Sequence, residues 1–303
     1  MLLSQIISDS KYKQALSDIL KIYIPEVMKL PIIREQSGFL KEQIKATNSD
    51  GVTDVATQAD EHIESVLRSK INTIHPEWSF WGEEGEKSQS TDQLIVVDPI
   101  EGTNNFKTYR DEQWGSVIAF VEDDMPVIGV VAVPAQKKAF IGIKDCGALE
   151  VMFDESVDIL QQSCVPMSLS PLNHEFTYNF SPHFELHITQ QAQKFKHLGT
   201  VIGTEEGDNP IFSSRQILEI DGNKFIDPES GALEAVTNRG TIYFKTSAEM
   251  AAVFVIINEL GGKVTDFSGA NWHLGIDTMI SARTAEDHKY LVSLVEKSTE
   301  GSQ

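Results

Sequence analysis

The sequence predicts an α+β protein, and three features of the 303-residue chain indicate this class. Apolar residues recur at helical spacings through the first thirty positions. Apolar runs between Ser116 and Ile143 follow one another across short turns, which is typical of an antiparallel meander of strands. A helix-like run, Ala248–Leu260, comes near the end of the chain. Helices that pack on a largely antiparallel sheet define the α+β class.

The N-terminal helices lead into a strand and then a capped helix. We expect Pro25 to break or kink the first helical run, because proline lacks the N–H that a helix interior needs. Lys45–Gly51 is polar and predicts a loop, and Val52–Ala56 predicts a short strand. Thr57 and Asp60 have the types and spacing of helix-capping residues, so a helix is expected directly after them.

Four strands are predicted in the rest of the N-terminal half. Leu94–Val97 is a strand of the buried type that ends abruptly at Asp98, so it delivers carboxylates to its C-terminal end. The meander follows as Ser116–Val121, Val127–Val133 and Ala139–Ile143. We expect one largely antiparallel sheet here.

The C-terminal half is predicted less completely, because periodicity does not fix the order of elements between residues 150 and 245. Ser247 is a suitable N-cap for the helix at 248–260, and Gly261-Gly262 is a suitable C-cap. The last residues predict a strand, a strand, a helix and a polar tail at 264–267, 278–281, 285–295 and 298–303. No low-complexity linker occurs, so we expect a packed boundary near residues 148–155.

Charge and cysteine content restrict the class of function. The chain has 25 Lys plus Arg against 45 Asp plus Glu, a formal net charge of −20, which opposes phosphate backbones and anionic lipid surfaces. We therefore expect neither a nucleic-acid polymer nor a membrane as partner. Two cysteines are too few for a disulfide framework, and the longest apolar run, Met250–Ile257, is too short to span a membrane. A cytoplasmic protein is predicted, whose excess acid either holds cations or only solvates the surface.

Acidic residues gather where predicted elements begin or end. The clusters are Asp54 with Asp60, Glu83 with Glu84, Asp98 with Glu101, and Glu249 alone. Helix capping and turn chemistry explain each cluster taken singly. Asp98 and Glu101 indicate more, because two carboxylates three residues apart across a proline turn can point into one space, where they repel unless a cation lies between them.

Gly102 and Thr103 follow this acidic pair directly. They open backbone amides at a predicted helix or turn N-terminus, which is a ready site for phosphate. Carboxylates for a hard divalent cation, placed beside amides for an anion, are the equipment of metal-assisted phosphoryl transfer.

Four motifs in order along the chain carry a family resemblance. They are Asp54–Asp60, Trp81–Gly85, Val97–Phe106 and Glu249–Gly262, and Gly129–Pro134 adds to them. Together they resemble the inositol monophosphatase superfamily of magnesium-dependent, lithium-sensitive phosphatases, over about residues 50–290. The resemblance implies a layered αβαβα sandwich of the sugar-phosphatase type and a homodimer. Residues 1–150 would carry most metal ligands, and residues 151–297 would complete the site.

The resemblance also implies which residues hold metal. Glu83, Asp98 and the backbone carbonyl of Ile100 would bind a first Mg²⁺, and Asp98, Glu101 and Glu249 would bind a second, with two or three ions in total. Li⁺ is expected as an inhibitor.

Catalysis and phosphate binding are assigned in the same way. Asp60 would orient the hydroxyl of Thr103, while Thr103 and Glu83 would position a metal-activated water for in-line attack on phosphorus. The amides of Gly102 and Thr103 would hold the phosphate. No protein nucleophile is implied.

The chain departs from the family pattern at two places: the family usually has Asp where this chain has Glu101, and a Trp-Asp pair where it has Ala248-Glu249. Each Glu adds a methylene, so a carboxylate overshoots its metal by roughly 1 to 1.5 Å unless the backbone retreats. Class II fructose-1,6-bisphosphatases resemble the chain in having Asp-Pro-Ile-Glu-Gly-Thr, which indicates that Glu can be accommodated. The alternative is a binding or regulatory protein that has lost turnover.

Substrate signals are thinner. Asn104-Asn-Phe106 favours an inositol monophosphate or another small polyol or sugar phosphate over a 3′(2′),5′-bisphosphate nucleotide, which is the alternative substrate. Lys245 would attract a second anionic group, or it is simply solvated, and Ser230 lies in a partial substrate-side motif. His183 and His187 have a metal-like spacing that we attribute to chance.

Overall fold

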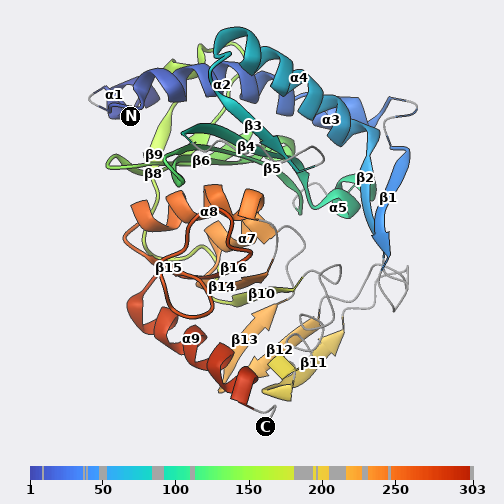
Figure 1. The fold of residues 1–303 in the computed structure, drawn as a ribbon, viewed down its shortest axis with the longest axis vertical. Helices are drawn as coiled ribbons and strands as arrows, with labels where there is room; N and C mark the ends of the chain where they lie inside the picture. Colours follow the sequence, from blue (N-terminus) through green and yellow to red (C-terminus); the bar gives the residue numbers. More distant parts are fainter. Residues whose placement is uncertain are drawn as a thin grey trace.

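The computed structural model of the chain describes residues 1–300 except 9, 37, 39, 48–52, 84–91, 110–112, 181–193, 196, 205–215, 227–230 and 245–246. Its elements form five layers, helix, sheet, helix, sheet and helix, stacked along the long axis of the molecule (Figure 1). The predicted α+β class and the layered αβαβα sandwich are therefore confirmed.

The outer helical layer is built from the N-terminal residues. Its helices are α1 (Leu3–Ile6), α2 (Lys13–Val27), α3 (Leu30–Arg34) and α4 (Gln58–Ile74). Beside them lies a two-stranded antiparallel hairpin of β1 (Glu42–Thr47) and β2 (Thr53–Thr57). The predicted cap of α4 is confirmed, because Asp60 Oδ2 accepts hydrogen bonds from the Thr57 backbone N–H at 2.7 Å and from the Thr57 hydroxyl at 2.6 Å.

The first sheet has seven strands in sequence order. They are β3 (Ser79–Gly82), β4 (Gln93–Glu101), β5 (Gly115–Glu122), β6 (Met125–Val133), β7 (Lys138–Ile143), β8 (Gly147–Met152) and β9 (Cys164–Pro166). Only β3 and β4 pair in parallel, and the remaining pairs are antiparallel, as the predicted meander requires. Short helices α5 (Thr103–Lys107), η1 (Pro134–Gln136) and η2 (Ile159–Gln161) interrupt this half.

The second sheet also has seven strands, in the order β11, β12, β13, β10, β14, β16 and β15. Their bounds are β10 (Phe176–Phe180), β11 (Thr200–Thr204), β12 (Gln216–Ile220), β13 (Asn223–Ile226), β14 (Gly240–Phe244), β15 (Lys263–Thr265) and β16 (Thr278–Ala282). Between the sheets lie α7 (Gly231–Thr237) and α8 (Ser247–Glu259), and α9 (Ala285–Glu300) covers the far face.

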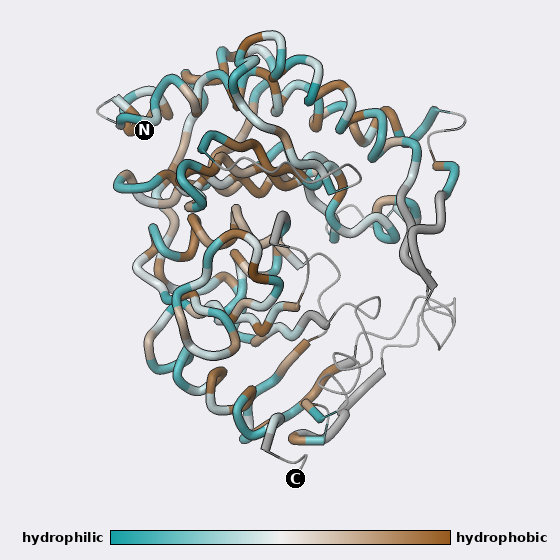
Figure 2. Tube along the Cα trace, viewed as in Figure 1, coloured by the Kyte–Doolittle hydropathy of each residue, from teal (hydrophilic) through white to brown (hydrophobic). Residues whose placement is uncertain are grey.

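Strand β4 shows why the first sheet is covered on both faces. Ile95 and Val97 belong to the core shared with the outer helices, whereas Leu94 and Val96 belong to the core shared with α8. Side chains alternate across a strand, so a strand buried on both faces is apolar throughout. Figure 2 shows hydrophobic residues concentrated along the strands of this sheet.

Glycine brings α8 to backbone contact with the first sheet. A Cβ built on Gly142 would lie 2.7 Å from the backbone N of Ile256, and one on Gly129 would lie 2.5 Å from the carbonyl oxygen of Ala252. Only glycine allows this approach, which fixes the position of α8 relative to β6 and β7.

Three expectations about local structure were wrong. Helix α2 does not break at Pro25 but continues to Val27, because a proline in the last turn removes only one hydrogen bond of the helix. Lys45–Thr47 belongs to strand β1 and not to a loop, since it pairs with β2. Helix α9 runs to Glu300, three residues into the predicted tail, and the buried Ser298 hydroxyl donates to the carbonyl oxygen of Val295 at 2.7 Å.

Two other expectations concern domains and membranes. The first sheet extends to Pro166, so residue 150 lies within β8, and the division into halves at 150 stays a prediction. Within the described part of the chain, no helix has both the length and the apolar character that crossing a membrane would need.

Candidate active site

Parallel pairing of β3 and β4 brings Glu83 beside Asp98. Gly82 is the register partner of Val97, and the backbone N–H of Glu83 donates to the Val97 carbonyl at 3.0 Å. The carboxyl ends of neighbouring parallel strands lie at the same edge of a sheet, so the next residue of each strand emerges there. The sheet thus places together two carboxylates, Glu83 and Asp98, that lie fifteen positions apart in the sequence.

A bulge in β4 directs Asp98 and Glu101 toward one side. The pairing with β5 shifts register between Asp98 and Glu101, and the Ile100 backbone N–H donates to Asp98 Oδ1 at 3.1 Å. Proline has no backbone N–H, so Pro99 leaves no unpaired donor where the pairing of β4 with β5 is interrupted. Asp98 and Glu101 are 1% and 2% exposed, so two carboxylates are almost completely removed from water here.

Glu249 reaches the same place from α8. It lies in the first turn of that helix, where the positive end of the helix dipole favours a carboxylate, and it is 3% exposed. The hydroxyl of Tyr243 donates to Glu249 Oε2 at 3.3 Å. Burial first, and then the carboxylates of Glu101, Glu249 and Asp98, raise the pKa of Tyr243 well above its ordinary value, so the hydroxyl keeps its proton.

Glu83, Asp98 and Glu249 form one group of possible metal ligands. Each contributes a carboxylate oxygen, and the three oxygens lie within 4.8 Å of one another. Asp98 Oδ2 is buried and accepts no hydrogen bond in the described structure. Burial, and then the charges of Glu83, Glu101 and Glu249, raise the pKa of Asp98 well above its ordinary value.

These observations fit a hard divalent cation. A buried oxygen without a donor, surrounded by like charges, is unfavourable unless an ion supplies positive charge. Carboxylate and carbonyl oxygens are the ligands that Mg²⁺ prefers. The donor set therefore suits the magnesium that the sequence predicts.

Glu101 lies close to this group without joining it. Its Oε1 accepts a hydrogen bond from the Gly231 backbone N–H at 2.8 Å, at the start of α7. Among the described residues, the group with mutually close ligand atoms contains Glu83, Asp98 and Glu249 and not Glu101. The structure thus brings three of the four predicted carboxylate ligands together, and the division of ligands between two ions stays a prediction.

The predicted phosphate site lies at the start of α5. Gly102 is its N-cap and has φ +87°, a left-handed conformation that glycine adopts without strain. The first amides of a helix have no partner within the helix, so they face whatever lies before it. The Thr103 hydroxyl donates to the Ile100 carbonyl at 3.1 Å, which ties the start of α5 to the turn that carries the carboxylates.

Other predicted residues are placed as follows. Asp60 is 1% exposed and accepts from Thr57, and its orienting role toward Thr103 stays a prediction. Asp54 lies in β2, opposite Ala46. Ser230, Lys245, Glu84, His183 and His187 lie outside the described residues.

Sequence reasoning missed two groups that contact the site, the Tyr243 hydroxyl and the Gly231 amide. Tyr243 lies near the end of a strand, six residues before Glu249 at the start of the next helix. No periodicity in the sequence relates these two positions, so their contact could not be predicted. Gly231 belongs to a segment that the sequence did indicate, Ser230–Leu233, as a partial substrate-side motif or a packed helix start, but not as a contact of a carboxylate.

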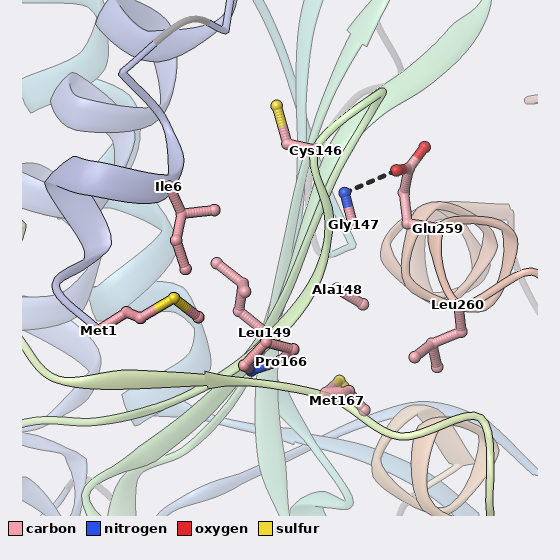
Figure 3. Close-up of a pocket in the computed structure, with 10 residues that line it drawn as sticks. All are labelled: Met1, Ile6, Cys146, Gly147, Ala148, Leu149, Pro166, Met167, Glu259 and Leu260. Atoms are coloured by element: carbon pink, nitrogen blue, oxygen red, sulfur yellow. Dashed lines mark hydrogen bonds between the residues drawn. The ribbon is translucent and has the colours of Figure 1, made fainter.

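The described structure also has a pocket of about 380 Å³ that is separate from these residues (Figure 3). Met1, Cys146 and Gly147 line it together with Glu259 at the opposite end of α8 from Glu249. Ten residues of helix separate the two glutamates by about 15 Å. None of the predicted site residues lines this pocket.

The fold and the site define a class: layered αβαβα proteins with a group of carboxylates that could hold a metal ion. Residues 27–300 match the model of the inositol monophosphatase family, and the chain belongs to this family. Members of the family are phosphatases, which hydrolyse small phosphoric monoesters. The resemblance stated from the motifs is confirmed.

Individual relatives agree with the family assignment. The chain is 37% identical over 214 residues to histidinol-phosphatase of Mycobacterium tuberculosis, covering 70% of this chain and 74% of that protein. It is 38% identical over 112 residues to quinic acid degradation cluster protein x of Neurospora crassa, covering 34% of this chain and 33% of that protein. The chain thus spans only about a third of the length of some curated relatives it matches.

A solved structure shows the same fold. The extragenic suppressor protein suhB of Bartonella henselae superposes with a TM-score of 0.68 at 18% identity, covering 94% of this chain and 99% of that chain. At this identity the likeness concerns the fold alone.

Proposed function

We propose that the protein is a magnesium-dependent phosphomonoesterase that hydrolyses a small polyol or sugar phosphate. The convergence of Glu83, Asp98 and Glu249 from β3, β4 and α8, next to the N-terminus of α5, carries this proposal. A protein with only solvated acidic turns would not bury Asp98 and Glu249 close to each other and to a third carboxylate, that of Glu83.

Each residue has a role in this proposal. Glu83, Asp98 and Glu249 would hold Mg²⁺, and Glu101 and the Ile100 carbonyl would be further ligands. When bound, Mg²⁺ neutralises charge on the phosphate and lowers the pKa of a water. The amides of Gly102 and Thr103 bind the phosphate oxygens, and Glu83 and Thr103 orient the attacking water. The water oxygen bonds to phosphorus as the ester P–O bond breaks, which releases inorganic phosphate and the alcohol.

The leading substrate is an inositol monophosphate. The family assignment and the Asn104-Asn-Phe106 ending of the turn support it. A second candidate is histidinol phosphate, which the 37% identity to a histidinol-phosphatase over 70% of this chain favours. A 3′(2′),5′-bisphosphate nucleotide remains the alternative. A cytoplasmic location and a homodimer stay predictions of composition and of family resemblance.

Phosphate release tests the proposal. The purified protein with Mg²⁺ is incubated with inositol, histidinol, sugar and nucleotide phosphates, and parallel assays use Mn²⁺ or add Li⁺. We expect release from at least one polyol or sugar phosphate, and Glu83→Gln should abolish it. Glu26→Gln is the matched control, because Glu26 is a buried carboxylate of the outer helix α2 that pairs with Lys70 at 2.6 Å.

A different outcome would favour the binding-protein alternative. If no ester is hydrolysed while metal still binds, the binding-protein alternative attributes the loss of turnover to the longer ligands Glu101 and Glu249. The double substitution Glu101→Asp and Glu249→Asp should then restore release, and its failure to do so would exclude ligand length as the cause.

A further inference from the structure

Two of the site's glutamates, Glu101 and Glu249, stand where the family usually has aspartate. A glutamate carboxylate is one methylene and one rotatable bond farther from the backbone than that of aspartate. Octahedral Mg²⁺ tolerates little error in ligand position, and ordering a free side chain costs entropy. A site built with glutamates therefore needs other groups that fix their orientation.

The side chain that contacts Glu249 is well placed for this. Tyr243 lies on β14, a central strand paired with β10 through Asn179 and with β16 through Met279. The residue is 1% exposed and packs in the core that the two sheets share with α7 and α8. A phenol on a central strand in a packed core has one orientation, so its hydroxyl is a fixed donor.

We propose that Tyr243 is a positioning residue of the metal centre. Its hydroxyl donates to Glu249 Oε2 at 3.3 Å and so turns the longer carboxylate toward Glu83 and Asp98. This inference rests on the metal centre of the proposed function and assigns to it a residue from outside the acidic motifs. Groups that hydrogen-bond to a metal ligand orient it and tune its affinity.

Glu101 is held in a comparable way. The Gly231 backbone N–H donates to its Oε1 at 2.8 Å, in surroundings where Glu101 is 2% exposed. Both glutamates are therefore contacted by a donor from the C-terminal part of the chain, one on β14 and one on α7. This similarity supports positioning by fixed donors, because a phenol hydroxyl in one case and a backbone N–H in the other donate to the carboxylate of a buried glutamate.

A purely structural role for Tyr243 predicts something different. A hydroxyl that only satisfies a buried carboxylate would affect the free energy of unfolding and leave the metal affinity of the folded protein unchanged. A positioning role predicts a change in metal affinity that depends on the length of residue 249. Metal binding without substrate separates these roles and does not depend on turnover.

The experiment titrates Mn²⁺ into the metal-free full chain and measures the dissociation constant by calorimetry. The variants are Tyr243→Phe, Glu249→Asp and their combination, with circular dichroism to check the fold. Tyr290→Phe is the matched control, since its hydroxyl also makes one hydrogen bond, to the Ile220 carbonyl at 2.9 Å, but on α9 away from the site.

We expect Tyr243→Phe to weaken Mn²⁺ binding about tenfold and Tyr290→Phe to leave it unchanged. In the Glu249→Asp background, where the carboxylate is too short to meet the hydroxyl, Tyr243→Phe should change the constant less than about twofold. Equal affinity of wild type and Tyr243→Phe, or an equal loss in both backgrounds, overturns the positioning role alone. If wild type binds no Mn²⁺, the metal centre of the proposed function fails as well.

Discussion

The two ends of helix α8 carry a glutamate each, and the two residues have opposite surroundings. At the C-terminal end, Glu259 accepts hydrogen bonds from the backbone N–H of Asp145 at 3.1 Å and from that of Gly147 at 2.9 Å, and Figure 3 shows the second of these. At the N-terminal end, Glu249 is 3% exposed and lies within 4.8 Å of the carboxylates of Glu83 and Asp98.

The difference shows what distinguishes a structural carboxylate from a functional one. Two backbone N–H groups stabilise the Glu259 carboxylate and tie α8 to the turn before β8, so this charge needs no cation. Glu249 shares its space with carboxylates, one of which, Asp98, has a buried oxygen that accepts no hydrogen bond in the described structure. A cation that joins such an arrangement stabilises it.

The largest effect on activity is expected from a substitution at the N-terminal end of α8, where the three carboxylates lie close together. Asp98→Asn should lower kcat/KM roughly a thousandfold, because it removes charge from the metal centre, and this corresponds to about 4 kcal/mol of transition-state stabilisation. The same change should raise the free energy of unfolding of the metal-free protein by about 1 kcal/mol, since it relieves repulsion. Steady-state kinetics and urea unfolding with a chelator measure the two quantities.

A stability loss in metal-free Asp98→Asn would contradict this view of the site. It would mean that the carboxylate is already satisfied without an ion, as Glu259 is.

The next effect concerns how α8 is held between its ends. Gly142→Ala should lower the free energy of unfolding by about 3 kcal/mol, because the new Cβ would lie 2.7 Å from the backbone N of Ile256 and force the helix off the sheet. Gly147→Ala is the control for crowding, since open space surrounds its Cβ position and its cost arises only from a φ of +92°. Equal losses in the two variants would show that close packing of α8 does not matter.

His288 is a buried titratable group outside the site, and it can be compared with the buried carboxylates. His288 is 3% exposed, its Nε2 lies 2.9 Å from the Thr265 hydroxyl, and burial, with a smaller effect of Lys263, lowers its pKa from 6.5 to about 4. The unfolded chain therefore binds a proton at a higher pH than the folded chain. Stability from His288 is complete above pH 6.5 and falls as the pH drops toward 4.

Unfolding at pH 7 and pH 5 tests this effect. The wild type should lose about 2 kcal/mol more than His288→Gln between the two values. Identical losses would show that His288 does not stay neutral in the fold.

The smallest effect is expected at the C-terminal end of α8, where backbone N–H groups donate to Glu259. Glu259→Gln should lower the free energy of unfolding by about 1 kcal/mol, because an amide group replaces one acceptor of two backbone N–H groups, and should change kcat/KM less than about twofold. Thermal unfolding and phosphate release measure the two quantities. A large loss of activity would mean that both ends of α8 contribute to catalysis.

The sequence predicts those parts of the fold that local patterns determine. Alternation and apolar runs predicted β5, β6 and β7, and the Thr57 and Asp60 spacing predicted the cap of α4. These signals are local because side-chain direction repeats every two residues in a strand and a cap acts within one turn. The family resemblance of the acidic motifs implied four carboxylate ligands, and three of them converge.

The remainder depends on contacts between distant residues. Strand β1 is polar and forms only because it pairs with β2, so its residues read as a loop. The order of the second sheet joins β10 to β13 and β14, which no local pattern encodes. Tyr243 and Gly231 donate to glutamates that the fold brings to them, and the residues around them in the sequence do not indicate these two contacts.

An anomalous difference map from crystals grown with Mn²⁺ tests the central claim most directly. We predict a peak within coordination distance of carboxylate oxygens of Glu83, Asp98 and Glu249 together. Mn²⁺ bound elsewhere, with these three side chains turned away from one another, would contradict the account.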